Sequence, residues 1–331
     1  MRVGIFRFAD RPKSHEAMDW WEAGVRCCGD KPVRLDVGDS SKALAGIDVG
    51  ISLFIPDKRR RGKHRVFISK AARALRQQGK RVLYFSVGFV HSRCDYEEEN
   101  GIPLGAAFEY IAELSDGERE AALSRIHYEA GFDGLKGEAD YCNRGAPEDR
   151  WNRLGVSLTP WRRSDGYILL IGQQPGGPST QDVDIVQWYR DTVASIRQVT
   201  GRTIVFRQHP RTALRDDAED READLPSSLV LSRNVYLRDD LRGAAAVVAF
   251  SSNAAVTAAI AGIPVFVASK RCMAWPVGNR DLRRIEDPEF PDRSRWAAEL
   301  AYTQWSVKEI TTGAAWAWLR PHALRGPRSC M

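Results

Sequence analysis

Residues 248–266 read VAFSSNAAVTAAIAGIPVF, and this stretch decides the fold. The apolar run 244–250 is typical of a buried strand, and it ends in the polar triplet Ser251-Ser252-Asn253. Small residues then continue to Ala261, which favours a short helix packed closely on a sheet, before Gly-Ile-Pro leads into another apolar strand. A strand, a helix and a second strand in this order form the repeating unit of an open parallel α/β sheet.

The polar triplet predicts an anion site. The first backbone amides of a helix have no partner within the helix and carry partial positive charge. The side chains of Ser251, Ser252 and Asn253 add hydrogen-bond donors at the same place. A diphosphate suits such a helix start. The alternative is an N-cap serine on a core helix, and the complete order of strand, triplet, helix, Gly-Ile-Pro and strand argues against it.

Two more polar motifs follow strands of the same half. The motif RQHPR, residues 207–211, comes directly after the expected strand 203–206, and QQPGGPS, residues 173–179, comes after the expected strand 167–172. Arginine suits phosphate oxygens because its donors form a planar fork, and glycines permit close backbone approach to a ligand. Ligands bind at the carboxyl ends of the strands in doubly wound sheets, so we expect one site. The residues predicted to bind a donor diphosphate are Gln173, Gln174, Arg207, His209, Arg211, Ser251, Ser252 and Asn253.

The amino-terminal half shows a similar alternation of strands and helices. Expected strands are 3–8, 33–37, 49–55 and 81–87, and expected helices are 14–27, with Ser14 as N-cap, and 66–78, closed by Gly79. This rhythm predicts a second parallel sheet covered by helices. Residues 131–163 are irregular and rich in Gly, Asp, Arg and Trp, which is typical of a functional loop or a linker.

The carboxyl-terminal half completes the expected organisation. Its expected strands are 167–172, 203–206, 229–231, 244–250 and 264–268, and its expected helices are 183–199, 253–261, 296–304 and 307–320. The fold class is therefore α/β, with two Rossmann-like doubly wound lobes. We place an acceptor-binding lobe at 1–160, a donor-binding lobe at 161–315, and a tail, 316–331, that crosses back to the first lobe.

Composition excludes several classes of protein. The chain has 331 residues, 43% hydrophobic and 28% charged, which is ordinary for a globular protein with a core. No apolar run reaches the ~18 residues of a membrane span, and the amino terminus lacks the pattern of a secretory signal, so we expect a cytoplasmic protein. The six cysteines form no CxxC and the six histidines no HExxH, so no metal site is predicted. The sequence leaves the oligomeric state open.

The order strand–GQxP, strand–RxHPR, strand–SSN–helix–GIPV resembles GT-B glycosyltransferases, and its His-Pro element is similar to that of capsule-polysaccharide transferases. The resemblance covers most of the carboxyl-terminal half. It implies a cleft between two lobes, a nucleotide-sugar donor such as UDP-glucose, and no required metal or other cofactor. It also implies that His209, Ser251 and Ser252 contact the donor diphosphate.

The same resemblance implies a general base. Capsule-type transferases place this base in an acidic pair followed by Gly, and Asp133-Gly134 is the match here, with Phe132 in place of the first acid. The alternative for Asp133 is a simple Asp-Gly turn. Asp10, which ends the first expected strand and so faces the expected cleft, is the second candidate for the base.

The acceptor is suggested by charge and by a further similarity. The formal net charge is +6, and residues 57–65 read DKRRRGKHR, which suits DNA phosphates. The irregular run 131–155 is similar to a set of phage proteins, some of which glycosylate hydroxymethylated DNA bases, and this resemblance implies a hydroxymethylated pyrimidine in double-stranded DNA as acceptor. The residues expected to contact it are Lys58, Arg59, Arg60, Arg61, Lys63, Arg65 and Lys136.

Three alternatives remain open from the sequence. A charge run such as 57–65 is most often a solvated loop. A second function that the sequence allows is a transferase for cell-envelope or capsule polysaccharide, which would share the fold and the donor site. A third is a non-catalytic protein that binds nucleic acid or nucleotide, because a fold by itself does not determine an activity.

Overall fold

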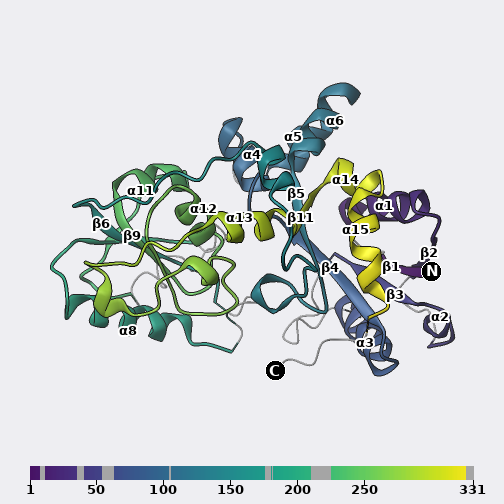
Figure 1. Cartoon of the computed structure of the whole chain (residues 1–331), viewed down its shortest axis with the longest axis horizontal. Helices are drawn as coiled ribbons and strands as arrows, with labels where there is room; N and C mark the ends of the chain where they lie inside the picture. Colours follow the sequence, from purple (N-terminus) through teal and green to yellow (C-terminus); the bar gives the residue numbers. More distant parts are fainter. Residues whose placement is uncertain are drawn as a thin grey trace. The chain divides into compact units, whose positions relative to one another are not determined.

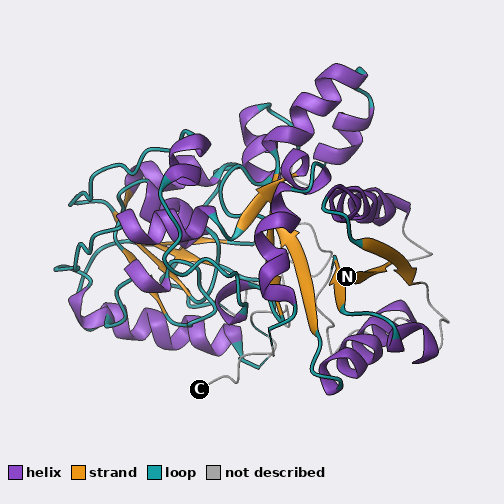
Figure 2. Cartoon of the chain, turned by 45° about the vertical axis from the view of Figure 1, so that its right-hand side comes forward, coloured by secondary structure: helices purple, strands orange, loops and turns teal. Residues whose placement is uncertain are grey.

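The computed structural model describes residues 1–7, 12–35, 41–53, 63–103, 106–175, 180, 182–209 and 225–325, with the side chains of 12–15, 41–42 and 63–69 left aside. Contacts divide the chain into two compact units. The first unit comprises residues 1–146 and 299–331, and the second comprises residues 147–298. Figure 2 shows helices and strands in both units. Among the described residues, no helix is both long and apolar enough to cross a membrane.

The first unit contains a six-stranded sheet in the order β11-β5-β4-β3-β1-β2. Its strands are β1 (Arg2–Phe6), β2 (Lys31–Leu35), β3 (Val49–Ser52), β4 (Arg81–Val87), β5 (His127–Phe132) and β11 (Gln304–Ser306). The first four run parallel, whereas β5 runs antiparallel to both β4 and β11. The carboxyl end of β4 therefore lies beside the start of β5.

Helices cover both faces of this sheet (Figure 1). They are α1 (Pro12–Cys27), α2 (Ser41–Ala45), α3 (Lys63–Gln77), α4 (Arg93–Glu99), α5 (Ala107–Ala112), α6 (Asp116–Arg125), α14 (Val307–Thr311) and α15 (Ala314–Ala323), together with the 3-10 turn η1 (Lys136–Glu138). Ile5 on β1 belongs to the core formed with α1, α14 and α15, and Phe6 belongs to the opposite core, which contains Leu75 of α3. This alternation is what a strand buried on both faces requires.

The second unit contains a fully parallel five-stranded sheet in the order β10-β9-β6-β7-β8. Its strands are β6 (Tyr167–Ile171), β7 (Ile204–Arg207), β8 (Val230–Leu231), β9 (Ala244–Ala249) and β10 (Val265–Val267). Its helices are α7 (Asp149–Leu154), α8 (Ile185–Arg197), α11 (Leu237–Gly243), α12 (Ala254–Ile260) and the first part of α13 (Ser294–Ala301), with 3-10 turns η2 (Trp275–Val277) and η3 (Leu282–Arg284). Ile168 and Leu170 pack against Tyr189 and Ile196 of α8. The five expected strands of this half are all present, within two residues at each end.

The two compact units divide at other residues than the expected lobes. Thr159 donates its amide to the carbonyl of Ile260 at 3.0 Å, and Arg162 donates to Gly262 at 2.8 Å, so the segment from residue 147 packs with the second sheet. At the other end, β11 pairs with β5, so the chain already belongs to the first unit at residue 299. The divisions therefore fall at residues 146 and 298, in place of the expected 160 and 315.

Three elements of the first unit also differ from expectation. The segment around residue 304 is the strand β11, not the end of a helix, because Gln304 pairs with Glu129 of the sheet. The expected helix 307–320 is broken at Gly313, whose φ of +87° ends one helix and begins another. Helix α1 begins at Pro12, and proline is favoured at the first position of a helix. Ser14 therefore lies within the first turn and is not the N-cap.

Candidate functional site

Gln173 and Ser251 meet at the carboxyl edge of the second sheet, just beyond β6 and β9. Gln173 Nε2 lies 3.0 Å from Ser251 Oγ, and the Ser251 amide donates to Gln173 Oε1 at 2.7 Å. The Gln173 amide donates to the hydroxyl of Tyr189 at 2.6 Å, and burial raises the pKa of Tyr189 to about 12, so that hydroxyl stays protonated. Both Gln173 and Ser251 are buried, so this pair joins the ends of β6 and β9 beneath the surface of the edge.

His209 lies at the same edge. The Gly172 amide donates to the carbonyl of Arg207 at 2.8 Å, which joins the end of β6 to the end of β7. A Cβ atom on Gly172 would lie 3.2 Å from the backbone nitrogen of His209 and 2.8 Å from the carbonyl oxygen of Arg207. A glycine is therefore needed at position 172, because a side chain there would clash with the backbone of Arg207 and crowd that of His209.

The guanidinium of Arg207 is already occupied. It forms an ion pair with the buried carboxylate of Asp240 and donates to the carbonyl oxygens of Asn234 at 3.0 Å and Val235 at 2.7 Å. Asp240 also accepts from Ser232 Oγ at 2.6 Å. Arg207 thus organises the turn after β8, and its observed contacts do not favour the direct phosphate contact that the sequence predicted.

Ser252 and Asn253 precede α12 as the sequence predicted, but the helix is short. It has seven residues and begins at Ala254, whose amide donates to Ser252 Oγ at 3.3 Å. A helix of two turns has a small macrodipole, so binding here depends on hydroxyl and amide groups more than on the helix. The thiol of Cys272, from the loop after β10, lies 3.8 Å from the Ser252 carbonyl oxygen and brings that loop to the same edge.

Asp133 lies at the opposite edge of the first sheet from the carboxyl ends of its parallel strands. It follows β5, and its amide donates to the carbonyl of Val82 near the start of β4. Arg81 Nε donates to Asp133 Oδ2 at 2.8 Å, and the same buried guanidinium reaches Asp140 Oδ2 at 2.9 Å. With a φ of +63°, Asp133 adopts the left-handed turn that Asp tolerates. These contacts favour the turn over the general base.

Lys136 lies beside the middle of β5 and the loop that follows β4. Its ammonium lies 3.1 Å from the fully buried Glu129 carboxylate and 4.7 Å from the centre of the Phe89 ring, and its side chain is 27% exposed. Tyr141 donates to Glu129 Oε2 at 2.6 Å, and burial together with the Glu129 charge raises the pKa of Tyr141 far above its ordinary value. Gln304 Oε1 accepts the Phe89 amide at 2.8 Å. A partly exposed cation beside an aromatic ring is suited to a polar ligand.

The sequence did not lead us to Glu129 or His127. Glu129 stands two residues before Gly131, so a signal existed in the acid-x-Gly pattern, although Ala130 replaces the second acid. His127 carried no motif, and its proximity to His91 depends on the antiparallel pairing of β5, which the residue pattern did not predict.

Several predicted site residues lie outside what the structure describes. These are Asp10, Lys58, Arg59, Arg60, Arg61 and Arg211, while Lys63 and Arg65 lie in the first turn of α3 with side chains that are not described. Gln174 is at the expected edge, and its carbonyl accepts from Thr180 Oγ1 at 2.8 Å. Within the described residues, no group of three or more His, Cys, Asp or Glu side chains is arranged to hold a metal ion.

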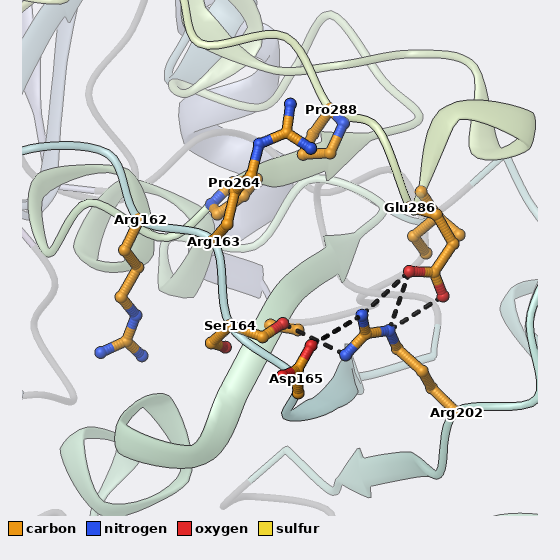
Figure 3. Close-up of a pocket in the computed structure, with 10 residues that line it drawn as sticks. Arg162, Arg163, Ser164, Asp165, Arg202, Pro264, Glu286 and Pro288 are labelled. Carbon is orange, nitrogen blue, oxygen red and sulfur yellow. Dashed lines mark hydrogen bonds and ion pairs between the residues drawn. The ribbon is translucent and has the colours of Figure 1, made fainter.

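A pocket of about 390 Å³ lies at the other edge of the second sheet, where its strands begin (Figure 3). Its arginines are engaged with acidic side chains and backbone carbonyls. Arg202 binds Glu286 through Nε at 2.8 Å and donates Nη1 to the carbonyls of Ser164 and Gly166. Arg162 donates to the carbonyls of Leu241 and Ala244. The pocket therefore lies where the strands of the second sheet begin, and it is separate from the predicted donor site at their carboxyl ends.

No protein-family model and no curated protein sequence matches the chain. Among solved structures, the chain is similar to Thermosulfurimonas dismutans KpsC, a β-Kdo 2,4 transferase, with 15% identity and a TM-score of 0.56 over 92% of this chain and 91% of that chain. It is also similar to the β-Kdo 2,7 transferase of the same organism, with 13% identity and a TM-score of 0.47 over 96% of this chain and 99% of that chain. The first likeness shows that the chain shares the α/β fold of that transferase.

Proposed function

We propose that this chain is a glycosyltransferase that uses a nucleotide sugar. The observation that carries the proposal is the joining of three motifs at one edge of a parallel sheet, through the Gln173–Ser251 pair and the Gly172 contact with His209. Ser252, Asn253 and His209 then offer hydroxyl, amide and imidazole groups where a doubly wound sheet binds its ligand. These groups would offset the charge that develops on the leaving diphosphate. We propose a UDP-sugar, such as UDP-glucose, as the first donor to test.

We propose a saccharide as the acceptor, as in a transferase for capsule or envelope polysaccharide. The overall fold of a β-Kdo 2,4 transferase supports this assignment, and so does the His-Pro element. The chemistry around Lys136 agrees, because an ammonium beside the Phe89 ring combines charge with an apolar face. A sugar that carries an acidic group would contact both the Lys136 ammonium and the Phe89 ring.

A hydroxymethylated pyrimidine in DNA is the second candidate acceptor. The observation that favours it is the charge of α3, on which Lys70 and Arg73 are exposed, following the basic run 57–65 of the sequence. Such a surface suits DNA phosphates, with affinity that falls steeply as salt rises. None of the structural similarities supports DNA as the acceptor.

The test is a transfer assay on the full chain. Radiolabelled UDP-glucose, UDP-N-acetylglucosamine and nucleotide-activated Kdo are each offered with p-nitrophenyl glycosides and with duplex DNA that contains hydroxymethylcytosine. The proposal expects labelled glycoside. Labelled DNA, with retention on DNA that is lost in high salt, would support the second candidate instead. Binding of nucleotide without transfer to any acceptor would favour a non-catalytic nucleotide-binding protein.

A further inference from the structure

Two histidines lie together at the carboxyl edge of the first sheet, in the loop after β4 and at the start of β5. The rings of His91 and His127 have centroids 5.8 Å apart and planes inclined by 39°. The His127 amide donates to the His91 carbonyl at 2.9 Å, and the His127 carbonyl accepts the Gly88 amide at 2.9 Å. The pair is therefore tied to the sheet through backbone contacts on both sides.

His91 has a strained backbone. Its φ of +51° lies in the left-handed region, which is uncommon for residues other than glycine. The preceding residues are clamped by Gln304, whose Oε1 accepts the amides of Phe89 at 2.8 Å and Val90 at 3.0 Å and whose Nε2 donates to the Val90 carbonyl at 2.8 Å. Strained conformations persist where the surroundings fix them, and they gather at functional sites.

The position of His91 suits a catalytic role better than that of Asp133. Both follow strands of the same sheet, but Asp133 lies at the start of β4, paired with buried Arg81, whereas His91 follows the end of β4. In doubly wound sheets, ligands bind at the carboxyl ends of strands. The His91 side chain is half-buried, while His127 behind it is buried at 8% exposure.

Resting on the proposed transferase activity, we propose that the His91 imidazole takes the proton of the acceptor hydroxyl and that His127 positions it. As the acceptor oxygen bonds to the anomeric carbon, the bond from that carbon to the donor phosphate oxygen breaks, and its electron pair leaves with the nucleotide. The hydroxyl proton passes to a ring nitrogen of His91 and then to water. Histidine is the side chain whose ordinary pKa suits this exchange near neutral pH.

A carboxylate and a backbone carbonyl lie near the pair. Asp95 on α4 acts electrostatically on His91, and burial raises the pKa of Asp95 while the nearby His91 lowers it. Asp95 Oδ2 accepts the Ser92 amide at 2.7 Å and so caps α4. On β5, His127 Nδ1 lies 3.3 Å from the carbonyl oxygen of Arg125. The acceptor proton therefore enters a site that contains the two imidazoles and lies near the Asp95 carboxylate.

The test compares His91→Ala, His127→Gln and the matched control His322→Gln on α15. Transfer is measured with the donor and acceptor that give the fastest wild-type turnover in the assay above, and UDP affinity and thermal unfolding are measured in parallel. We expect His91→Ala to lower kcat about 100-fold while UDP affinity stays within about twofold, and free imidazole to restore part of the rate. His127→Gln should lower kcat about tenfold, and His322→Gln should match the wild type.

Two results would overturn the inference and leave the transferase assignment intact. In the first, the wild type transfers sugar and the kcat of the His91→Ala variant is within about threefold of the wild-type kcat. The other is a loss of kcat that free imidazole fails to restore and that comes with weaker UDP binding or a lower Tm, because a structural role explains that pattern. A wild type that binds UDP but transfers no sugar would overturn both the inference and the proposed function.

Discussion

Gln173 and Ser251 hold each other across the carboxyl edge of the second sheet, with Gln173 Nε2 at 3.0 Å from Ser251 Oγ and the Ser251 amide at 2.7 Å from Gln173 Oε1. The two residues are far apart in the sequence and belong to different motifs. Their reciprocal hydrogen bonds convert two neighbouring strand ends into one rigid surface. Each group is buried, so loss of one partner leaves the other unsatisfied.

Replacement of Gln173 by Ala should therefore lower both stability and nucleotide binding. The buried Ser251 amide and hydroxyl would lose their partner, at a cost of about 1–3 kcal/mol in the free energy of unfolding. We expect UDP affinity to fall about tenfold, because the surface under the nucleotide loses its support. Urea unfolding and calorimetric titration measure the two effects. Gln198→Ala, at the exposed end of α8, is the control and should change neither quantity.

Arg81→Ala should lower the free energy of unfolding of the first unit more than any surface substitution does. The Arg81 guanidinium is 1% exposed and contacts Asp133, Asp140 and the carbonyl oxygen of His322. Its removal leaves two carboxylates without their buried partner, which costs about 3–5 kcal/mol. Urea unfolding measures the loss, and Arg73→Ala on the exposed side of α3 is the control. A loss near zero would mean that the ion pairs do not hold the turn.

Asp133→Asn separates a structural role from a catalytic one. Asparagine tolerates the left-handed backbone at this position but weakens the pairing with Arg81. We expect lower stability with a kcat that stays within about threefold of the wild type at a temperature where both are folded. A fall of about 100-fold in kcat at unchanged stability would instead restore Asp133 as the general base.

Acid should remove a contribution that Glu22 makes to stability. Burial alone raises the pKa of Glu22, but hydrogen bonds and charge from Arg34 and Arg26 outweigh it and bring the pKa to about 2, against an ordinary 4.5. A folded-state pKa below the unfolded one stabilises the protein at higher pH, and this contribution fades as pH falls from 4.5 towards about 2. Glu22→Gln should therefore be less stable than the wild type at pH 7, with the difference shrinking across that window.

The control for this pH series is Glu16→Gln on the same helix. Glu16 pairs with Arg119 at 2.7 Å, and the two side chains are 42% and 40% exposed, so loss of the pair should change the free energy of unfolding little at any pH. A Glu22→Gln variant whose deficit stays constant from pH 7 to pH 2.5 would show that packing, not charge, causes it.

Residues 147–298 should fold alone and bind nucleotide. This segment contains the complete parallel sheet and both halves of the Gln173–Ser251 pair. Gly262, with φ of +74°, lies against the Pro160 carbonyl, which ties the leading segment to this unit. We expect cooperative thermal unfolding and UDP affinity close to that of the full chain. A fragment starting at residue 161 should be less stable, because it lacks the hydrogen bond from Thr159 to Ile260.

The second sheet was predictable because its signals are local. Strands such as 167–172 and 244–250 are apolar runs bounded by turn residues, and their order in the chain defines the sheet. In the first unit, β5 carries His127 and Glu129 among its buried positions, so no apolar pattern marks it. Its neighbour β11 comes from the far end of the chain. Pairings of this kind depend on tertiary packing, which a residue pattern does not encode locally.

The candidate site shows the same division. Ser251, Ser252 and Gln173 were predictable because each follows an apolar strand directly, and parallel strands present their ends at one edge. Arg207 was predicted as a phosphate ligand from its residue type and its place after a strand, but the buried Asp240 engages it. The histidine pair had no signal in the sequence, because His91 and His127 come together only through the antiparallel turn of β5.

The most direct test of the donor site is a crystal structure of the full chain soaked with UDP. We predict that the two phosphates lie at the carboxyl edge of the second sheet, within hydrogen-bond distance of Ser252 or Asn253 and of the His209 side chain. Phosphates bound at the opposite edge, beside Arg162 and Arg202, or an edge at Gln173 that holds no nucleotide at saturating UDP, would contradict it.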